Sequence, residues 1–487
     1  MSKKQFPISR RFTANDQVAF AELSGDHNPL HLDALAARRL LFGTPVAHGI
    51  NLVLWGLDAW LERVARVVEI SSLKVLFLRS VPVEAEVELN EEEFSGAVKL
   101  CFRCAGVTAA RLEFTWRELH GVENDLPEDQ FPNRGESRLV TEREIPGKEG
   151  RLALCLARQA VLRSFPNLAV RLSPWQIAAL LGSTRMVGME CPGLHSLYSE
   201  LAFTAGGPDQ SCDLAYQVAK FDERFGLVSI NLRSRGLTGT LRAFLRPAPR
   251  KQAGLAELRG VVPAGEFSGQ KALVIGGSRG LGEVTAKLLA AGSAEVRLTY
   301  HRGEDDARRV AAEIGVVGAP AGCFQLDVLS SDRSRLLRLL QGWRPTHVYY
   351  FATPPIFTGV QGVFSSELFN SFSACYIGGF LNVLEPLKLL AVRNYFQPSS
   401  VAVETLPPGL GEYAAAKLAG ETLGQYLEQA DHALRIYRPR LPGLDTDQTA
   451  RLLSFTHQDP VPVILEHLRM FQAASRTVVC QESRAIL

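Results

Sequence analysis

The sequence contains few cysteines, no excess of charge of either sign and no long apolar run. Eight cysteines in 487 residues are too few for a scaffold held together by disulfides. Lys plus Arg total 53 and Asp plus Glu total 51, which gives a net charge of +2. This balance provides no electrostatic argument for a nucleic-acid partner.

A membrane location is not expected either. No apolar stretch approaches the roughly 18 residues that a membrane span needs. The basic start at Met1–Arg11 is not followed by the apolar segment of a signal peptide. We therefore expect a soluble, cytoplasmic protein without a membrane partner.

The composition is that of a globular protein. Hydrophobic residues make up 46% and charged residues 21%, which excludes disordered and fibrous classes. At about 150 residues per domain, the length suggests three domains. The pair Cys101 and Cys104 lies inside a strand-like run with no second pair nearby. We expect thiols of a reducing compartment there, and no metal site.

The pattern along the chain predicts two related N-terminal domains and a different C-terminal one. Residues 1–120 pass from a helical stretch into alternating strands, and residues 151–250 repeat that order. The segment 121–150 is rich in Pro, Gly and charge, which is typical of a linker. Within residues 266–487, short apolar strands alternate with helices. This alternation predicts an α/β domain with a doubly wound parallel sheet of Rossmann type.

A polar cluster stands near the N-terminus, in Phe20-Ala-Glu-Leu-Ser-Gly-Asp26-His-Asn28-Pro-Leu-His31. The Asn-Pro step predicts a turn between Asp26 and His31, and such a turn can aim a carboxylate and an imidazole at one point. That pair could hold one water and move its protons, with Asn28 orienting the loop or the water. The alternative is a structural loop in which Asp26 caps and His31 packs.

This cluster resembles the signature of the MaoC-like R-specific enoyl-CoA hydratases, which have the hot-dog fold. The signature ends on a small residue six positions after the His, which is Ala37 here. A second block, Phe42–Ile50, matches the family segment that leads into the long central helix, expected here over about 49–64. Family backbone N–H groups near the start of that helix bind the thioester oxygen, and an open helix N-terminus suits that role.

The resemblance implies a reaction and its residues. Asp26 and His31 would add water to a 2-enoyl thioester, or remove it from an R-3-hydroxyacyl thioester. The sequence leaves open which of the two carries which proton. The supporting residues would be Asn28, His48 and Gly49.

The middle region keeps a related block, Met186–Ser196, without the acid–base cluster. It resembles a degenerate second hot-dog unit. Because a single unit leaves an unpaired sheet edge, we expect an α+β double hot dog with one active half. His195 is either catalytic or, more simply, a packing residue. The end of this region is basic, and its charges either meet a coenzyme A phosphate or an acidic carrier protein, or are solvated: Arg233, Arg235, Arg242, Arg246, Arg250 and Lys251.

A glycine loop follows the apolar strand Lys271–Ile275 and opens a helix at about Glu283–Ala291. In that context the glycines allow a tight turn and close approach of a pyrophosphate. The spacing resembles the short-chain dehydrogenase/reductase family. The loop residues expected to contact a dinucleotide are Gly276, Ser278, Arg279, Gly280, Leu281 and Gly282.

A second element carries the same resemblance. Tyr413 and Lys417 lie four residues apart, hence on one helix face, where the ammonium would lower the pKa of the phenol. Such a tyrosine can pass a proton to a carbonyl oxygen as hydride arrives. Ser400 stands 13 residues before Tyr413, a spacing the family uses for a catalytic Ser, with Ser399 as the alternative. The family's catalytic Asn is missing near Cys375 and Tyr376.

The cofactor preference follows from the second strand, which ends at Tyr300-His-Arg302 without an acidic residue. An acid there would bind a ribose 2′-hydroxyl, whereas Arg279 and Arg302 suit a 2′-phosphate. We therefore expect NADPH (NADP). By the resemblance, Asp327 would contact the adenine, and Ala352 would line the cofactor in place of the family's Asn-Ala-Gly segment.

Together these features predict a bifunctional enzyme. A 3-oxoacyl-thioester reductase (ketoreductase) and a 3-hydroxyacyl-thioester dehydratase would act in sequence in fatty-acid or polyketide-like biosynthesis. The substrate would be carried on coenzyme A or an acyl carrier protein, and the chain could form a homodimer. One alternative is the oxidative direction, as an enoyl-CoA hydratase and 3-hydroxyacyl-CoA dehydrogenase. Another is a non-catalytic NADPH-binding reductase domain attached to a dehydratase.

Overall fold

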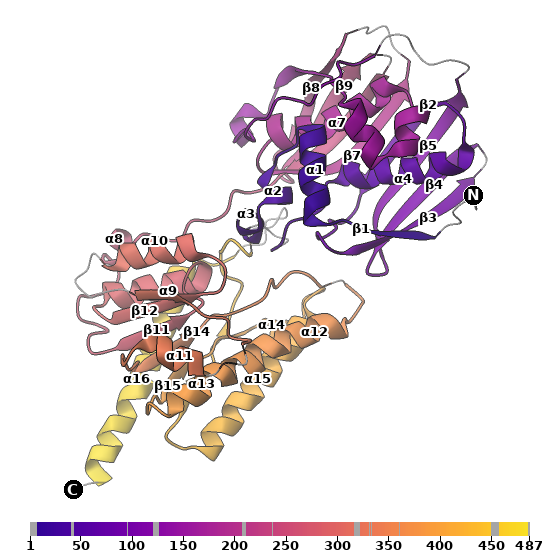
Figure 1. The fold of residues 1–487 in the computed structure, drawn as a ribbon. Helices are drawn as coiled ribbons and strands as arrows, with labels where there is room; N and C mark the ends of the chain where they lie inside the picture. Colours follow the sequence, from indigo (N-terminus) through magenta and orange to yellow (C-terminus); the bar gives the residue numbers. More distant parts are fainter. Residues whose placement is uncertain are drawn as a thin grey trace. The chain divides into compact units, whose positions relative to one another are not determined.

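The structure is a computed structural model of the chain (Figure 1). It describes residues 7–39, 43–94, 96–119, 126–206, 211–235, 237–315, 322–330, 332, 334–359, 361–449 and 457–485. The chain divides into two compact units, with the boundary between Ala248 and Pro249. Phe42 of the second motif and residues 121–125 of the expected linker lie outside the described residues. Nowhere in the described part is there a helix long and apolar enough to cross a membrane.

The N-terminal unit consists of two halves built from the same sequence of elements. The first half contains β1 (Ile8–Arg11), α1 (Ala14–Ser24), α2 (Pro29–Leu32), α3 (Ala34–Arg38), α4 (Gly49–Val64), β2 (Val68–Phe77), β3 (Glu86–Phe94), β4 (Ala97–Cys104) and β5 (Val107–Glu118). The second half contains β6 (Glu149–Ala153), α5 (Arg158–Ser164), α6 (Pro166–Arg171), α7 (Pro174–Arg185), η2 (Met186–Glu190), β7 (Ser196–Ala205), β8 (Asp213–Asp222), β9 (Leu227–Ser234) and β10 (Leu237–Leu245). The expected helix over 49–64 matches α4.

The strands of both halves form one ten-stranded sheet in the order β1-β3-β4-β5-β2-β7-β10-β9-β8-β6. The two halves have the same strand order, since β6 to β10 occupy the places of β1 to β5 in mirror order. The halves join where β2 pairs antiparallel with β7, from Ser72–Thr204 to Leu76–Glu200. This pairing removes the edge that each half alone would expose.

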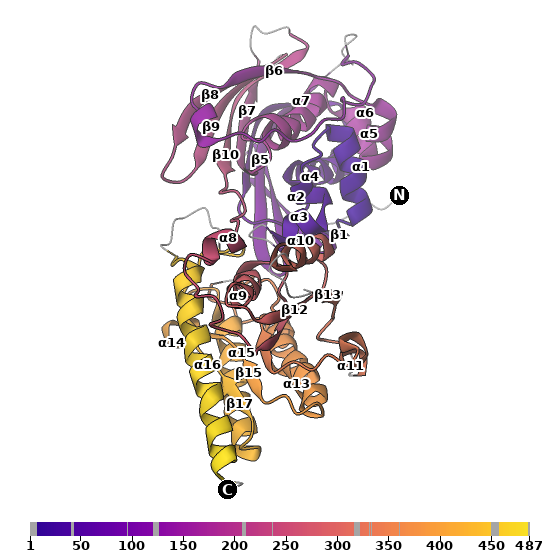
Figure 2. The ribbon, with the colours of Figure 1, turned by 90° about the vertical axis from the view of Figure 1, so that its left-hand side faces the viewer.

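The two long helices α4 and α7 lie on one face of this sheet (Figures 1 and 2). Helix α4 is apolar around most of its circumference, and Ile50, Leu54 and Leu57 are fully buried. Such a helix is stable only inside a core. Its approach to the sheet is close, because a Cβ on Gly56 would meet the ring of Phe102 at 2.6 Å.

The expected linker is packed against the second half rather than free. Arg138 N donates to Met189 O over 2.9 Å, and Leu194 N donates to Arg138 O over 2.8 Å. The carbons of Pro132 also lie against Gly25. Glycine and proline indicated correctly that this segment is irregular, but they carried no information about the contacts that hold it.

The C-terminal unit is a six-stranded parallel sheet in the order β13-β12-β11-β14-β15-β17. Its strands are β11 (Lys271–Ile275), β12 (Glu295–Tyr300), β13 (Gly322–Gln325), β14 (His347–Tyr350), β15 (Asn394–Phe396) and β17 (Arg435–Tyr437). Counted along the chain, this is the order 3-2-1-4-5-6 of a doubly wound dinucleotide-binding sheet. The predicted parallel sheet is therefore confirmed.

Helices cover both faces of this sheet. They are α8 (Leu255–Leu258), α9 (Gly280–Ala291), α10 (Glu304–Gly315), α11 (Ser334–Leu340), α12 (Ser366–Ser373), η3 (Ala374–Gly379), α13 (Phe380–Lys388), α14 (Ala402–Thr405), α15 (Gly411–Ala430) and α16 (Pro460–Ala485), and a short parallel pair is formed by β16 (Ser399–Ser400) and β18 (Arg440–Leu441). Alternate residues of β11 enter opposite cores: Val274 packs toward α9 and α16, and Leu273 packs toward α13. Burial on both faces explains the continuously apolar strands.

Candidate functional site

The acid–base cluster of the N-terminal unit forms at the end of α1. That helix stops at Gly25, whose φ of +75° is left-handed and suits a residue without a Cβ. Asn28 then caps α2 by accepting a hydrogen bond from Leu30 N over 3.0 Å, with Pro29 in the first helical turn. The turn places Asp26 before the helix and His31 within it.

The side chains of Asp26 and His31 face each other. One carboxylate oxygen of Asp26 and one ring nitrogen of His31 lie within 4.8 Å, which is close enough for one water to bridge them. Nδ1 of His31 lies 2.7 Å from the carbonyl oxygen of Val46. Because a carbonyl only accepts, Nδ1 carries the proton, and Nε2 is left to exchange a proton at the site.

Burial controls the protonation of this pair. Asp26 is 2% exposed, and desolvation raises its pKa, against the opposing effects of the His31 charge and a hydrogen bond from Thr184. Desolvation lowers the pKa of His31, against the opposing charge of Asp26. The two shifts bring the two pKa values toward each other, as proton exchange near neutral pH requires.

The second half supplies two residues that hold Asp26. Thr184 on α7 donates its hydroxyl to Asp26 Oδ2 over 2.6 Å. Gly188 in η2 lies directly against the carboxylate, since a Cβ there would stand 2.1 Å from Asp26 Oδ1. Any larger residue at Gly188 would displace the Asp26 carboxylate. The half without an acid–base cluster therefore completes the site.

The supporting residues have structural roles. Asn28 Nδ2 donates to the carbonyls of Gly188 and Leu194, at 3.0 and 3.3 Å, so it orients the loop and fastens it to the second half. His48 is fully buried, with its ring nitrogens 3.0 Å from Gln17 Oε1 and 3.0 Å from Asp26 O. Its ring also stacks on His31 with centroids 3.7 Å apart.

Gly49 is the first residue of α4. The N–H groups of a first helical turn have no partner inside the helix, so this end can donate to an oxygen. The Phe77 ring packs against the glycine, and a Cβ at this position would meet it at 2.7 Å. Glycine is thus required for helix and sheet to approach closely here.

Asp26, His31 and His48 are close enough together to be considered as a metal site. The donor atoms argue against one. Both ring nitrogens of His48 and Nδ1 of His31 already face protein atoms. Only His31 Nε2 and the carboxylate are left, fewer ligands than a zinc site uses.

The Thr184 contact makes a testable prediction. Thr184→Val removes the hydroxyl but keeps the shape, so the pKa of Asp26 should rise further. We expect the rate of enoyl-thioester hydration to fall about 10- to 100-fold, the value of a hydrogen bond to a buried charge. The acidic limb of its pH profile should also move to higher pH. The control Thr184→Ser, which keeps the hydroxyl, should retain the wild-type profile. An unchanged profile in Thr184→Val would contradict this role.

In the C-terminal unit, a second candidate site lies at the carboxyl ends of the parallel strands. The glycine loop joins β11 to α9, and Gly276 and Gly280 have φ values of +78° and +55°. A Cβ on Gly282 would stand 2.2 Å from Gly276 O. Glycine is therefore required for the turn itself, and the turn stands at the start of a helix, a place that suits a pyrophosphate.

Three predicted cofactor residues follow the ends of neighbouring strands around this loop. Arg302 follows β12 and is exposed, Asp327 follows β13, and Ala352 follows β14. The main chain of Ala352 lies against Gly276. Arg279 is already paired with Asp447, whose Oδ2 is 2.7 Å from Arg279 Nη1. Ser278 is buried and Leu281 is in the first turn of α9.

Two members of the predicted Ser–Tyr–Lys set, Ser400 and Tyr413, lie together. Tyr413 lies near the start of α15 and is hydrogen-bonded to Ser400. Ser399 points elsewhere, because its hydroxyl donates to Glu421 Oε1 over 2.5 Å. The structure thus favours Ser400 over Ser399 as the partner of the phenol.

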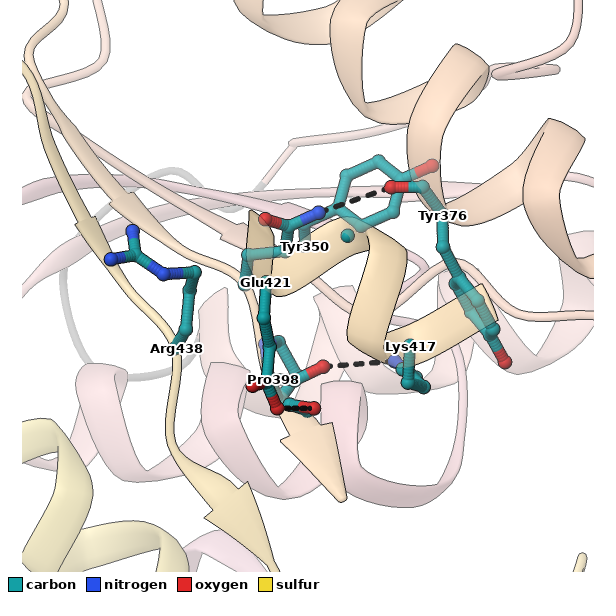
Figure 3. A pocket seen from close by; sticks show the side chains of 9 residues that line it. Tyr350, Tyr376, Pro398, Lys417, Glu421 and Arg438 are labelled. Atoms are coloured by element: carbon teal, nitrogen blue, oxygen red, sulfur yellow. Dashed lines mark hydrogen bonds between the residues drawn. The ribbon is translucent and has the colours of Figure 1, made fainter. Parts of the chain in front are cut away.

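The position of Lys417 differs from the prediction. Its Nζ donates to Pro398 O over 2.8 Å (Figure 3) and lies 5.8 Å from the centroid of the Tyr413 ring. Burial raises the pKa of Tyr413 to about 12, and only the hydrogen bond with Ser400 opposes this shift. The predicted lowering of the pKa of Tyr413 by Lys417 was wrong for this structure, because the ammonium is turned toward Pro398.

Tyr376 fills the region where an Asn was expected. It lies in η3, and its hydroxyl is 2.6 Å from Thr353 Oγ1. Lys417 Nζ stands 3.9 Å above its ring, and burial lowers the pKa of Lys417 to about 8. The aromatic face therefore stabilises the ammonium.

The comparisons with known proteins concern the domains that carry these two candidate sites. A family model described as "MaoC like domain" matches residues 2–109, and one described as "short chain dehydrogenase" matches residues 270–342. An uncharacterized oxidoreductase, YgfF of Escherichia coli, is 31% identical over 180 residues, which cover 34% of this chain and 72% of that protein. The chain belongs to the short-chain dehydrogenase family. The predicted MaoC-like domain ahead of this short-chain dehydrogenase domain is likewise confirmed.

The MaoC-like match is local. The (R)-specific enoyl-CoA hydratase of Aeromonas caviae is 49% identical over 45 residues, 9% of this chain and 34% of that protein. The chain spans only 27–34% of the length of the curated hydratase and dehydratase relatives that it matches. A solved short-chain dehydrogenase from Escherichia coli CFT073, complexed with NADPH, is 23% identical, with 42% of this chain and 92% of that one covered and a TM-score of 0.38.

Sequence reasoning missed Thr184 and Gly188 as site residues. They are 158 and 162 residues from Asp26 along the chain, and no spacing links them to it. The block Met186–Ser196 was noticed as a fold element only. Its small residue at Gly188 was the available signal, since a glycine inside a helical segment indicates close packing.

Proposed function

We propose that the chain is a bifunctional enzyme that reduces a 3-oxoacyl thioester and dehydrates the resulting R-3-hydroxyacyl thioester. Its N-terminal unit would be a double hot dog with one active half. The shared strand order of the two halves and the β2–β7 junction support that assignment. The observation that carries the proposal is the presence, in one chain, of an assembled Asp26–His31 pair and an assembled Ser400–Tyr413 pair.

Dehydration needs one proton taken from C2 and one given to the departing 3-hydroxyl, which leaves as water. One carboxylate oxygen of Asp26 and one ring nitrogen of His31 lie within 4.8 Å of each other, and the 3-hydroxyl would bind between them. The thioester oxygen would accept from the open N-terminus of α4 at Gly49, where developing negative charge is stabilised. The reverse sequence of proton transfers hydrates an enoyl thioester.

Reduction needs a proton at the substrate oxygen. Tyr413, hydrogen-bonded to Ser400, is placed to donate it, and Ser400 would hold the same oxygen. NADPH, when bound, supplies the hydride. The buried ammonium of Lys417 would favour the phenolate that remains, once the nicotinamide ribose or a water competes for its bond to Pro398.

NADPH fits the residues better than NADH. The two residues directly after β12 are His301 and Arg302, so no acid stands there to bind a ribose 2′-hydroxyl, and Arg302 is exposed. Arg302 would therefore bind the 2′-phosphate. Arg279 could join it only by exchanging Asp447 for the phosphate, so we assign the larger share to Arg302.

A preference for NADPH favours the reductive, biosynthetic direction, with fatty-acyl or polyketide-like thioesters on coenzyme A or a carrier protein as substrates. Placing both reactions in one molecule raises the concentration of the hydroxyacyl intermediate near the second site. A second candidate is an NADPH-binding domain without turnover. Tyr376 in the place of an Asn and the raised pKa of Tyr413 favour it.

One incubation tests the proposal. The full chain is mixed with acetoacetyl-CoA and NADPH, and the thioesters are followed by mass spectrometry, with NADH in a parallel sample. We expect the reduced and dehydrated product, formed faster with NADPH. If NADPH is oxidised but no dehydrated product forms, only the reductase part of the proposal is supported. If NADPH is not oxidised with either coenzyme A or carrier-protein substrates, the non-catalytic candidate is favoured.

A further inference from the structure

One arginine of the N-terminal unit is buried without an acidic partner. Arg246 directly follows β10 and is 6% exposed. Its Nε donates to Ser196 O over 3.3 Å, whereas its Nη2 is enclosed and has no hydrogen-bond partner. Desolvation lowers the pKa of Arg246 only to about 10, and no acidic group among the described residues opposes that shift. A charged guanidinium thus lies inside the protein with an unused edge.

The backbone does not require an arginine at this position. Arg246 N donates to His195 O over 2.8 Å, one step beyond the strand pair Ser196–Leu245. In the first half, Leu119 N donates to Val67 O over 2.9 Å, one step beyond the pair Val68–Glu118. The same place in the repeat therefore holds Leu and Val in one half and Arg and His in the other.

Of these two equivalent positions, only the one in the second half, with Arg246 and His195, lies near Asp26 and His31. Leu194, the neighbour of His195, accepts a hydrogen bond from Asn28, two residues after Asp26. The charge of Arg246 is also close enough to lower the pKa of His31. At the equivalent end of the first half, α6 fills the space, with Asn167 N and Leu168 N donating to Asp58 Oδ1.

An unpaired buried charge destabilises a fold by several kcal/mol, so its presence beside a site indicates a ligand of opposite charge. We propose that Arg246 binds a carboxylate at the far end of the acyl group, so that the N-terminal unit acts on thioesters of dicarboxylic acids. This rests on the hydration and dehydration function proposed above. A guanidinium edge matches a carboxylate with two parallel hydrogen bonds.

The enclosure of Nη2 favours a carboxylate over the phosphates of coenzyme A. A slim acyl chain can carry one carboxylate into an enclosed site, whereas burial of a multiply charged diphosphate would be far more costly. The sequence left two interpretations open for the basic residues of this region: contact with a phosphate or a carrier protein, or solvation on strand faces. Solvation is wrong for Arg246, because its side chain is buried and its Nε donates to Ser196 O.

Binding of inert ligands tests the proposal. Saturated acyl-CoAs of four, five and six carbons are compared in pairs, each dicarboxylic thioester against the monocarboxylic one of equal length, by titration calorimetry with the full chain. We expect at least one dicarboxylic member to bind about 10- to 100-fold more tightly, as a charge-assisted hydrogen bond allows. Equal binding within all three pairs overturns the proposal without any variant.

Arg246→Met assigns the effect to this residue. Methionine keeps much of the length without the charge, and such replacements of buried charges often leave a fold intact, which the melting temperature will check. We expect the dicarboxylic preference to vanish. A dicarboxylic preference that survives in Arg246→Met overturns the proposal. A second comparison uses coenzyme A and pantetheine thioesters of the same acid. If the wild type prefers the coenzyme A thioester and Arg246→Met abolishes that preference, Arg246 binds the phosphates and the proposal is overturned.

The outcome is independent of catalysis. The saturated ligands cannot be hydrated or dehydrated, so they report binding alone. Failure of the wild-type chain to hydrate crotonyl-CoA or any dicarboxylic enoyl-CoA would refute the proposed hydratase function, while the paired titrations would still decide whether Arg246 binds an acyl carboxylate.

Discussion

Replacement of Tyr413 by Phe is expected to lower the rate of 3-oxoacyl-thioester reduction by about 10²- to 10⁴-fold, the usual contribution of a positioned general acid. The phenolic hydroxyl is the group that interacts with Ser400, and it is the only part of Tyr413 that Tyr413→Phe removes. The ring packs against Phe372 and Tyr376, with centroids 5.7 and 5.9 Å away. Because the ring remains, the fold and the glycine loop should be unaffected.

The measurement is NADPH oxidation with acetoacetyl-CoA, together with NADPH binding by fluorescence titration. We expect the dissociation constant for NADPH to stay within about twofold while turnover is lost. Hydration of crotonyl-CoA by the same preparation serves as the internal control for a folded protein. If Tyr413→Phe oxidises NADPH at the wild-type rate, Tyr413 is not the proton donor. If neither protein oxidises NADPH, the C-terminal domain is a binding module.

Asp26→Asn is expected to have the second large effect, a loss of about 10²- to 10⁴-fold in the hydration of crotonyl-CoA. An amide occupies the same space and can still accept from Thr184, so the geometry of the pair is retained. The amide cannot accept a proton, however, and the exchange between Asp26 and His31 stops. Reduction of acetoacetyl-CoA should continue at the wild-type rate, because Asp26 belongs to the other unit.

The same substitution should make the protein more stable at neutral pH. Burial raises the pKa of Asp26 in the folded chain, so between the unfolded and folded pKa values the folded state binds more protons. Stability from this group is therefore present at low pH and is lost as pH rises through the folded pKa. Asparagine has no charge to desolvate, and we expect a higher melting temperature at pH 7, measured by calorimetry.

A comparison of Asp26→Asn with wild type at low pH provides the control. When Asp26 is protonated, the side chain and its amide replacement are both uncharged, and the difference in melting temperature should shrink. A variant that melts lower than wild type at pH 7 would show that the carboxylate stabilises the fold. In that case Asp26 would contribute to stability, and it would not be a residue that is kept for function at a cost in stability.

The elements that the sequence determined by itself are those set by local periodicity and by loops that close over a few residues. The apolar pattern of Gly49–Val64 can only be a buried helix, and the apolar strand Lys271–Ile275 with its glycine turn can only enter a parallel sheet. The contact between Asp26 and His31 is also local, since one turn brings them together. Each of these follows from fewer than about twenty residues.

Contacts between distant segments were decided only by the tertiary structure. Thr184 and Gly188 reach Asp26 because β2 pairs with β7, which places the end of α7 against the first half. The burial of Arg246 was likewise decided by the fold, since the sequence left its exposure open. The direction of the Lys417 ammonium is also set by the fold, which brings the carbonyl of Pro398 within hydrogen-bond distance of it. No spacing along the chain encodes these distances, because they arise from packing of two separately specified halves and of strands with helices far apart in sequence.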